Sequence, residues 1–206
     1  MSVKEELIDY FKALPGVGPR QAERFIFSLM KMSGDEITRF SDLIKEVRGN
    51  MKVCKQSFQI YFDTYDKTGL SPIERDEHRD SSLLMIVEKD SDLKAVEESS
   101  VYIGKYFVIG NLEPLIQKKK KLYSRIPELI ERVKILENQS VLKEIIFALS
   151  PSLEGDMTMN KIKDIIETEI PFYSFRISTL GRGISTGSEL EYLDRSTISS
   201  ALEGRK

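Results

Sequence analysis

The chain contains 206 residues, of which 40% are hydrophobic and 31% charged, a length that allows one large domain or two small ones with separate cores. Its 31 Lys and Arg residues against 33 Asp and Glu residues give a formal net charge of −2. This balance excludes a global positive field that would attract a polyanion, so any contact with nucleic acid must come from a local patch.

The single cysteine, Cys54, excludes an internal disulfide. The sequence has no apolar run near the length of about 20 residues that a membrane span needs, and its first residues, MSVKEELIDY, lack a signal-peptide core. We therefore expect two structural units in a soluble cytoplasmic protein without a membrane contact.

Two short helices are predicted on either side of the stretch LPGVGP. Gly16 and Gly18 permit backbone angles that other residues avoid, and Pro19 suits the first turn of the second helix. Apolar residues recur at helical spacing on both sides, at Leu7, Ile8, Phe11 and Leu14 before the corner and at Ala22, Phe25, Ile26, Leu29 and Met30 after it.

This corner is a candidate site for a DNA phosphate. Free N–H groups at a helix N-terminus attract anions, and Arg20 and Arg24, one turn apart, would add positive charge. The alternative is an ordinary helical hairpin whose arginines are only solvated. The order of hydrophobic residue, Pro, Gly, hydrophobic residue and Gly, followed by a basic helix, resembles the helix-hairpin-helix motif, which grips phosphates without reading bases.

The segment from Ile37 to Tyr65 has apolar residues in steps of three and four, which indicates a helix that Gly49 and Asn50 should interrupt. We expect a buried amphipathic helix followed by a cluster of aromatic side chains; a short coiled coil is the alternative. Cys54 alone cannot hold zinc, which takes about four ligands. His78, the only histidine, lies in the charged run ERDEHRD and is expected to be solvated.

The second half alternates strand and helix patterns. Residues 82–87 and the segment EIIFALS, 144–150, are predicted strands, and residues 127–136 and 158–169 are predicted helices. This alternation predicts an α/β fold with a small, mostly parallel sheet that helices cover on both faces. In such sheets the functional crevice lies beyond the carboxyl ends of the strands.

Acidic residues follow two of these strands. Glu88, Asp90 and Asp92 come after the first, and Glu154 and Asp156 come after the second. Carboxylates gathered in this way could hold Mg²⁺, which prefers oxygen ligands. The alternative is that acidic residues are simply common in loops, so a magnesium ion remains uncertain.

Taken together, VEKDSD and SLEGDMT look like the two acidic motifs of a Toprim domain. The ending GRGISTGSELEYLDRSTISSALEGR is similar to that of the RecR family of recombination mediators, usually RGLPVGGDLEYADELTL, and YIGKYFVIG resembles YxGxYHVLGG. The ending matches without a gap at Arg182, Gly183, Gly187, Leu190, Glu191, Tyr192, Asp194 and Thr197. With the N-terminal corner, the likeness covers nearly the whole chain.

The resemblance implies four regions. Residues 1–50 would be a helix-hairpin-helix DNA-binding region, 51–79 a degenerate zinc-finger segment, 80–178 a Toprim domain, and 179–206 a C-terminal motif for contacts between subunits.

In the family four cysteines bind zinc, but in this chain the corresponding positions carry Cys54, Ser57, Ser71 and Glu74. We therefore expect no zinc, and no cofactor apart from the magnesium ion that the acidic residues leave open. The run Lys118 to Lys121 would be a solvated loop or an added phosphate contact.

What the resemblance implies about function is a non-enzymatic role in recombinational DNA repair. Such proteins form dimers or ring-shaped tetramers around DNA and act with RecO and RecF to load RecA onto gapped DNA. The DNA-binding set would be Gly16, Gly18, Arg20 and Arg24; the partner-binding set Glu88, Asp92, Glu154 and Asp156; and the subunit contacts Gly187, Leu190, Glu191 and Tyr192.

The main alternative is a magnesium-dependent Toprim nuclease, with Glu88 as general base and Glu154 and Asp156 on the metal. A protein of this family that serves only as a scaffold is a third possibility. The sequence leaves open the choice of dimer or tetramer, of main partner, and of single- or double-stranded DNA.

Overall fold

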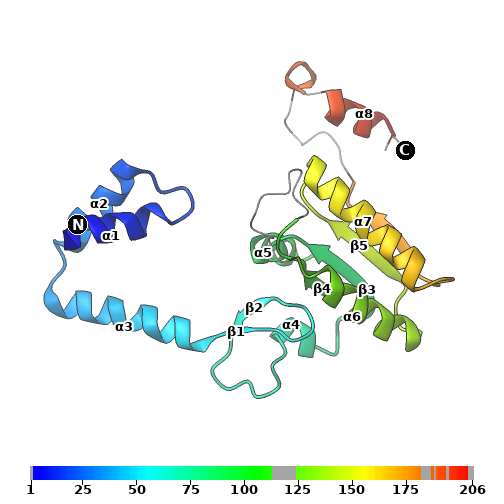
Figure 1. Cartoon of the computed structure of the whole chain (residues 1–206), viewed down its shortest axis with the longest axis horizontal. Coiled ribbons are helices and arrows are strands. Elements are labelled where there is room, and N and C mark those ends of the chain that lie inside the picture. Colours follow the sequence, from blue (N-terminus) through cyan, green and yellow to red (C-terminus); the bar gives the residue numbers. More distant parts are fainter. Residues whose placement is uncertain (1, 113–123, 182–186, 188, 194, 204–206) are drawn as a thin grey trace. The chain divides into compact units, whose positions relative to one another are not determined.

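The computed structural model describes residues 2–112, 124–181, 187, 189–193 and 195–203. Its internal contacts divide the chain into two compact units, Met1–Met51 and Lys52–Lys206, and Figure 1 labels most of their elements. The run Lys118 to Lys121, and the motif positions Arg182, Gly183 and Asp194, lie outside the described residues.

The first unit consists of the helices α1 (Val3–Lys12), α2 (Pro19–Leu29) and α3 (Gly34–Asn50). Helices α1 and α3 begin with capping boxes at Ser2 and Ser33. Each serine side chain accepts the backbone N–H of the glutamate three residues later, and the side chain of that glutamate accepts the backbone N–H of the serine. Helix α1 packs on α2 through the rings of Phe11 and Phe25, whose centroids are 5.5 Å apart. The predicted pair of helices around the corner is confirmed.

Helix α3 differs from the prediction of a buried helix. It ends at Asn50, as the Gly49-Asn50 pair predicts, but none of its residues is buried. Ile44 and Val47, on its apolar face, are 55% and 53% exposed. Helical spacing of apolar residues shows that a helix has an apolar face; it does not show that the same unit covers this face.

What we call the finger segment, residues 51–79, starts at the last residue of the first unit and otherwise belongs to the second. It contains a two-stranded sheet of β1 (Met51–Val53) and β2 (Ile60–Phe62), followed by the short helix α4 (Pro72–Arg75). The predicted aromatic cluster is wrong, because Phe62 is 58% and Tyr65 90% exposed. Tyr61 is buried, whereas the ring of Phe58 packs edge-on against Phe107 of the following domain, at 5.4 Å between centroids.

The main sheet has four strands, β3 (Asp80–Val87), β4 (Gly104–Val108), β5 (Glu144–Ala148) and β6 (Arg176–Thr179). Their order is β4-β3-β5-β6 and every pairing is parallel. Val87 pairs with Val108 on one side and with Ala148 on the other, so the carboxyl ends of three strands lie at one edge. The parallel sheet predicted from residues 82–87 and 144–150 is confirmed.

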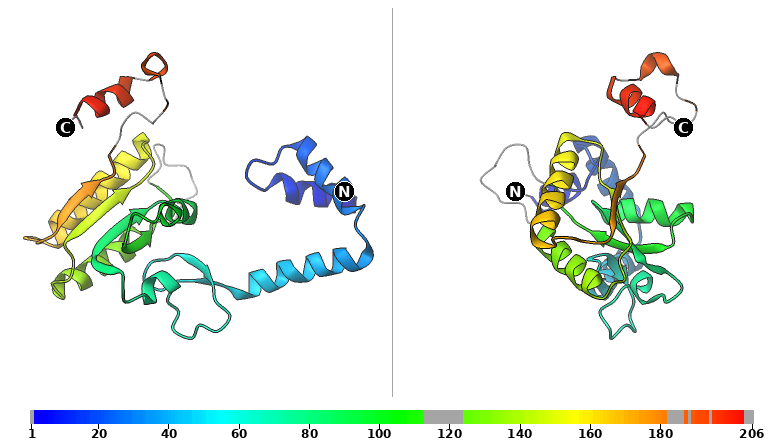
Figure 2. Two further views of the ribbon diagram at one scale, coloured as in Figure 1. Left: turned by 180° about the vertical axis from the view of Figure 1, so that it is seen from behind. Right: turned by 90° about the vertical axis from the view of Figure 1, so that its right-hand side faces the viewer.

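Helices cover both faces of this sheet, as predicted. Figure 2, right, shows α6 (Ile126–Asn138) and α7 (Leu153–Glu169) on one side and α5 (Asp90–Ser99) on the other. Alternate residues of β3 point to opposite faces: Leu84 and Ile86 enter the larger core with α6 and α7, and Met85 and Val87 the smaller core with α5. Burying each such side chain contributes roughly 1.5–3 kcal/mol to stability.

The C-terminal motif contains a 3₁₀ turn, η1 (Leu190–Tyr192), and the helix α8 (Arg195–Glu203). Gly187 has a φ of +88°, a conformation that suits glycine. Leu190 and Tyr192 are 68% and 79% exposed, and Glu191 is exposed as well. Among the described helices, none is long and apolar enough to cross a bilayer.

Candidate functional site

The corner between α1 and α2 presents backbone N–H groups at the start of α2. Gly16 has a φ of +76°, which turns the chain, and Gly18 is the N-cap in extended conformation. The first intrahelical bond of α2 runs from Ala22 N–H to Gly18 C=O, at 3.0 Å. The amides of Arg20 and Gln21 precede that bond, so they are free to bind an anion.

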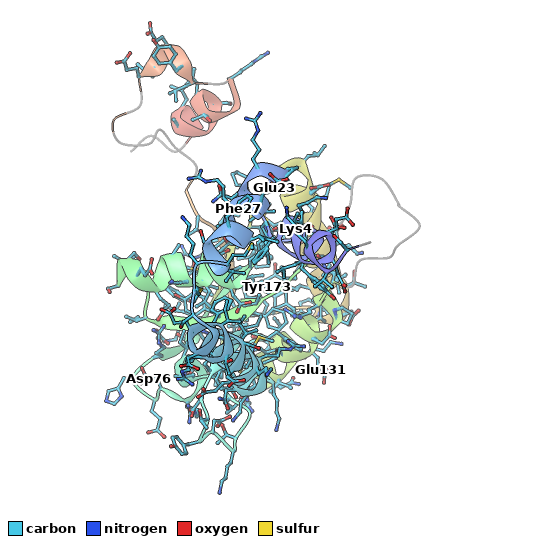
Figure 3. All side chains as sticks on the ribbon, turned by 90° about the vertical axis from the view of Figure 1, so that its left-hand side faces the viewer. Lys4, Glu23, Phe27, Asp76, Glu131 and Tyr173 are labelled. Carbon is cyan, nitrogen blue, oxygen red and sulfur yellow. The ribbon has the colours of Figure 1, made fainter. Side chains whose placement is uncertain are left out.

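Arg20 and Arg24 lie exposed on α2, whereas Ala22 and Ile26 form its buried side against α1. Neither arginine forms an ion pair with another described residue. The neighbouring surface carries Lys4, whose Nζ lies 5.6 Å from the centre of the exposed Phe27 ring (Figure 3). The corner therefore combines free amides with two exposed arginines, with the exposed Glu23 between them on α2, on a chain that is slightly negative as a whole.

The carboxyl ends of β3 and β4 border a cavity of about 420 Å³, which we call the acidic cavity. The residues around it are of both charges and include Glu88, Lys89, Asp90, Val108, Gly110, Asn111, Leu112, Arg125 and Glu154. The structure thus brings Glu88 and Glu154, 66 residues apart in the sequence, to one cavity, as expected from the parallel sheet.

Both carboxylate oxygens of Glu88 have partners within the protein. Oε1 lies 2.8 Å from the Lys89 ammonium, and Oε2 accepts a short hydrogen bond from the Ser150 hydroxyl. Burial raises the pKa of Glu88, but the bonds from Lys89 and Ser150 outweigh it and hold this pKa below its usual value. Glu88 is therefore an ionised carboxylate that is already hydrogen-bonded on both sides.

The other acidic residues have different surroundings. Asp90 Oδ1 accepts the backbone N–H of Ile60 at 2.7 Å, which joins the finger segment to the start of α5. Asp92 Oδ2 accepts the Lys89 N–H at 3.0 Å and so caps α5. Asp156 lies partly exposed in the first turn of α7, two residues after Glu154, and is not part of the cavity lining.

The four positions that correspond to zinc ligands lie together in the finger segment. Cys54, Ser57 and Ser71 are buried, and the Glu74 side chain is 6% exposed. The Cys54 sulfur accepts the Ser57 N–H at 3.5 Å. Burial raises the pKa of the Cys54 thiol, but hydrogen bonds from Ser57 and from nearby backbone amides outweigh it and lower the pKa.

This donor set does not fit a structural zinc ion. The Ser57 hydroxyl oxygen accepts the Gln59 N–H at 3.4 Å, and the Ser71 oxygen accepts the Glu74 N–H at 3.2 Å as the cap of α4. Glu74 Oε1 is bound to the guanidinium of Arg132 at 2.7 Å. Zinc sites use three or four thiolates, imidazoles or carboxylates. Among the described residues, no three Asp, Glu, Cys or His side chains form such a group.

Several residues that hold these sites together have no sequence signal of their own. Arg125 lines the acidic cavity, donates to the Val108 carbonyl at 2.9 Å and lies 5.0 Å from the centre of the Phe58 ring. Arg132 of α6 and Lys105 of β4 both donate hydrogen bonds to the finger segment. Nothing in the local sequence marks these three basic residues, and only their long-range partners reveal their positions.

A carboxylate network organises the loop after β2. Asp66, 1% exposed in its side chain, accepts hydrogen bonds from the Tyr61 hydroxyl at 2.6 Å, from the Thr68 N–H at 2.8 Å and from the Gly69 N–H at 3.0 Å. The Thr68 and Tyr61 hydrogen bonds lower the pKa of Asp66 strongly. Burial and the Asp66 carboxylate in turn raise the pKa of Tyr61 to about 12.

Three family models match the chain: RecR, helix-hairpin-helix over residues 4–48; the Toprim domain over residues 82–176; and RecR, C-terminal over residues 183–206. The chain is similar along its length to curated proteins named Recombination protein RecR. The protein from Acidithiobacillus ferrooxidans is 31% identical over 203 residues, which cover 98% of this chain and 94% of that protein.

The relative from Legionella pneumophila strain Philadelphia 1 is 34% identical over 208 residues, covering 100% of this chain and 96% of the relative. The relative from Prochlorococcus marinus strain MIT 9313 is 35% identical over 200 residues, covering 97% and 98%. Full-length similarity at this level, together with both RecR models and the Toprim match, establishes that the chain belongs to the RecR family.

Proposed function

We propose that this protein is a DNA-binding recombination mediator that works in the cytoplasm as an oligomeric clamp. The observation that carries the proposal is the corner between α1 and α2, where Gly16 is left-handed and Arg20 and Arg24 are exposed beside free amides. This corner occurs in a chain of the RecR family, whose curated relatives are named recombination proteins.

Binding at this corner would be to the phosphate backbone. Helix N-terminal amides and arginine side chains recognise phosphate oxygens, which carry no base sequence. A patch of a few cations on a chain with a net charge of −2 gives weak affinity that falls as salt rises. We therefore expect DNA binding by one subunit to be weak, sensitive to salt and independent of sequence.

Self-assembly would compensate for this weakness. When several subunits encircle one strand, each further contact occurs at a high effective concentration, so that avidity replaces affinity. The exposed apolar residues of α3, in the first unit, and Leu190 and Tyr192, in the C-terminal motif, are suitable surfaces for contacts between copies. A dimer or a ring-shaped tetramer would use these surfaces.

The acidic cavity would serve partner proteins. We assign Glu88, Asp92, Glu154 and Asp156 to an acidic region that binds RecO-like or RecF-like proteins and so helps to load RecA on gapped DNA. Charge complementarity of this kind sets specificity and the rate of association. Because Asp92 caps α5, Glu154 and Asp156 of α7 are the better positions at which to test the contact.

A non-enzymatic role is favoured over a Toprim nuclease by the surroundings of Glu88. A general base or a metal ligand needs an available carboxylate oxygen, whereas Glu88 is bound by Lys89 and Ser150. Incubation of supercoiled plasmid with protein and Mg²⁺ tests this choice. We expect no cleavage; cleavage by the wild-type protein that disappears in Glu88→Gln would establish the nuclease instead.

The DNA-binding proposal is tested by charge reversal at the corner. Arg24→Glu should lower affinity for a DNA duplex at least tenfold at low salt and reduce the slope of affinity against salt. Lys94→Glu is the control, because it reverses the charge of an exposed helical residue of the second unit, on α5, whose pair with Glu98 at 3.7 Å is itself exposed to solvent. Equal affinity of Arg24→Glu and the wild-type protein, with both folded by circular dichroism, would remove the corner from the DNA site.

The partner proposal is tested by a double reversal, Glu154→Lys with Asp156→Lys. We expect this variant to lose capture of a RecO-like protein and to keep the solution mass and the DNA affinity of the wild-type protein. Retained capture would show that the partner binds elsewhere.

A further inference from the structure

Two cations of the Toprim domain converge on the second half of the finger segment, the α4 region. The first is Arg132 of α6, whose side chain is 10% exposed. Its guanidinium donates to Glu74 Oε1 at 2.7 Å and to the carbonyl oxygen of Tyr106, in β4, at 3.1 Å. Arg132 therefore connects three elements, namely α6, β4 and α4.

The second cation is Lys105 of β4, which is buried. Its ammonium donates to the carbonyl oxygens of Ile73 at 3.0 Å, Glu74 at 3.0 Å and Asp76 at 2.8 Å. An ammonium has three N–H donors, so each can serve one of these acceptors. The carbonyl groups at the end of a short helix lack intrahelical donors, and the Lys105 ammonium supplies the missing hydrogen bonds.

The first half of the segment is also fastened to the sheet. The Ser57 carbonyl accepts the Val108 N–H at 2.8 Å, on the outer edge of β4, and the Ile60 N–H donates to Asp90 at 2.7 Å. Both halves of the finger segment are thus bound to the same sheet through charged groups or backbone bonds. In a four-cysteine finger, a metal ion performs this joining by binding both halves at once.

We propose that Arg132 and Lys105 replace the structural metal ion of the finger segment, so that this segment folds without zinc and as part of the Toprim domain. A metal ion supplies positive charge that comes from solution; here the positive charge is covalently attached to β4 and α6. Glu74, at the position of the last zinc ligand, receives a guanidinium in place of a metal.

The same arrangement disfavours a divalent cation. The guanidinium of Arg132 is already bound to Glu74 Oε1 at 2.7 Å. A second cation placed among these groups would be repelled. Among the described side-chain oxygens of the finger segment, Glu74 Oε2 and Gln59 Oε1 are buried without a hydrogen-bond partner. One carboxylate oxygen and one neutral amide oxygen are far short of a tetrahedral zinc site.

The first test compares Arg132→Met, Glu74→Gln and the double variant. Each single change leaves one buried polar partner without its counterpart, so each should lower the melting temperature by about 6–20 °C. The double variant should recover much of this loss, because neither charge is then left unpaired. Single variants as stable as the wild-type protein, or strictly additive losses in the double variant, would overturn the proposal.

The second test needs no variant. The wild-type protein, purified without added metal, should contain no stoichiometric zinc, and its melting temperature should be the same with EDTA, with added zinc and with neither. Stoichiometric zinc, together with a lower melting temperature in EDTA, would overturn the proposal even if the single variants fail to fold. The outcome is independent of DNA binding, so it can be distinguished from failure of the proposed function.

A third test rebuilds the metal site. The variant S57C/S71C/E74C restores four cysteines with Cys54 but leaves Arg132 buried and unpaired. We expect zinc to bind at least tenfold more tightly when Arg132→Gln is added. Lys134→Gln, on the same helix, is the matched control, because Lys134 is paired with Glu169 on α7, at 2.7 Å. An equal gain from the two changes would show that Arg132 does not occupy the place of the metal charge.

Discussion

Gly155, at the start of α7, faces the backbone carbonyl oxygen of Ser150 so closely that a Cβ atom on the glycine would lie 2.1 Å from that oxygen. The hydroxyl group of the same Ser150 donates to Glu88. The close approach of backbone to backbone therefore places the loop after β5 against the acidic cavity. Only glycine permits this approach, because the nearest atom belongs to the main chain and cannot rotate away.

Gly155→Ala should destabilise the protein by about 1–3 kcal/mol, because the added methyl group must push the Ser150 loop away. Gly49→Ala is the control: Gly49 lies in α3 with no atom near its Cβ position, and alanine there should stabilise the helix by up to about 1 kcal/mol. Urea unfolding measures both changes. Equal stability of Gly155→Ala and the wild-type protein would mean that the loop moves at no cost.

The stability of the finger segment should depend on pH through Asp66. The Thr68 and Tyr61 hydrogen bonds lower its pKa in the folded state, whereas an unfolded aspartate has a pKa of about 3.9. Its contribution is therefore fully present above pH about 4 and is lost as the pH falls through the lower, folded-state value. Asp63, whose pKa is lowered first by the bond from Arg75, acts in the same direction.

Hydrogen exchange of residues 60–70 at pH 7 and in acid measures this effect. We expect protection at pH 7 that decreases in acid, and Asp66→Asn should reduce protection at pH 7 and flatten the pH dependence. Asp164→Asn, at an exposed position on α7, should change neither. An unchanged pH profile in Asp66→Asn would assign the acid sensitivity to another group.

The two glycines of the N-terminal corner should respond differently to substitution. Gly16 has a φ of +76°, whereas Gly18 is an extended N-cap, and neither Cβ position is crowded. Gly16→Ala should therefore cost about 1–2 kcal/mol from backbone strain alone. Gly18→Ser should be neutral or slightly stabilising, because serine is a good N-cap. Hydrogen exchange of residues 1–51 in the full-length protein, measured as the temperature rises, compares the stability of the two variants. Equal losses of stability would contradict the assigned backbone geometry.

Assembly should depend on the two exposed apolar surfaces separately. Ile44→Glu on α3 and Leu190→Asp in η1 replace side chains that are 55% and 68% exposed, so neither should unfold the subunit. If each surface forms one kind of contact, each single variant should halve the mass of a tetramer, and the double variant should be monomeric. Light scattering measures the masses, and Lys45→Ala, beside Ile44, is the control. A double variant with wild-type mass would place the contacts elsewhere.

Much of the architecture follows from local features of the sequence. The spacing of apolar residues predicts α1, α2, α6 and the strand at Ser82–Val87, because side-chain period depends only on backbone geometry. The corner follows from the conformational limits of glycine and proline. The motifs around Glu88 and Glu154 predict the common edge of a parallel sheet, since the carboxyl ends of parallel strands meet there.

The sequence alone determined the family resemblance, the order of the elements and the absence of enough zinc ligands. The tertiary structure decided which groups surround the positions that correspond to zinc ligands. An aromatic cluster is expected from Phe58, Tyr61, Phe62 and Tyr65, yet Arg132 binds Glu74 across 58 residues of sequence. Such a pair depends on which helix packs against which loop, and no periodicity within either segment encodes that contact.

The exposure of the apolar face of α3 was also decided by the tertiary structure. Its apolar spacing is the same as that of a buried helix, and only the neighbours of a helix determine whether its face is covered. Local sequence therefore fixed the helix and its apolar side, because hydrogen bonds and side-chain spacing act over a few residues. Burial in the sheet core and the pairing of Arg132 with Glu74 required the fold, because their free energy depends on groups that the chain brings together from distant positions.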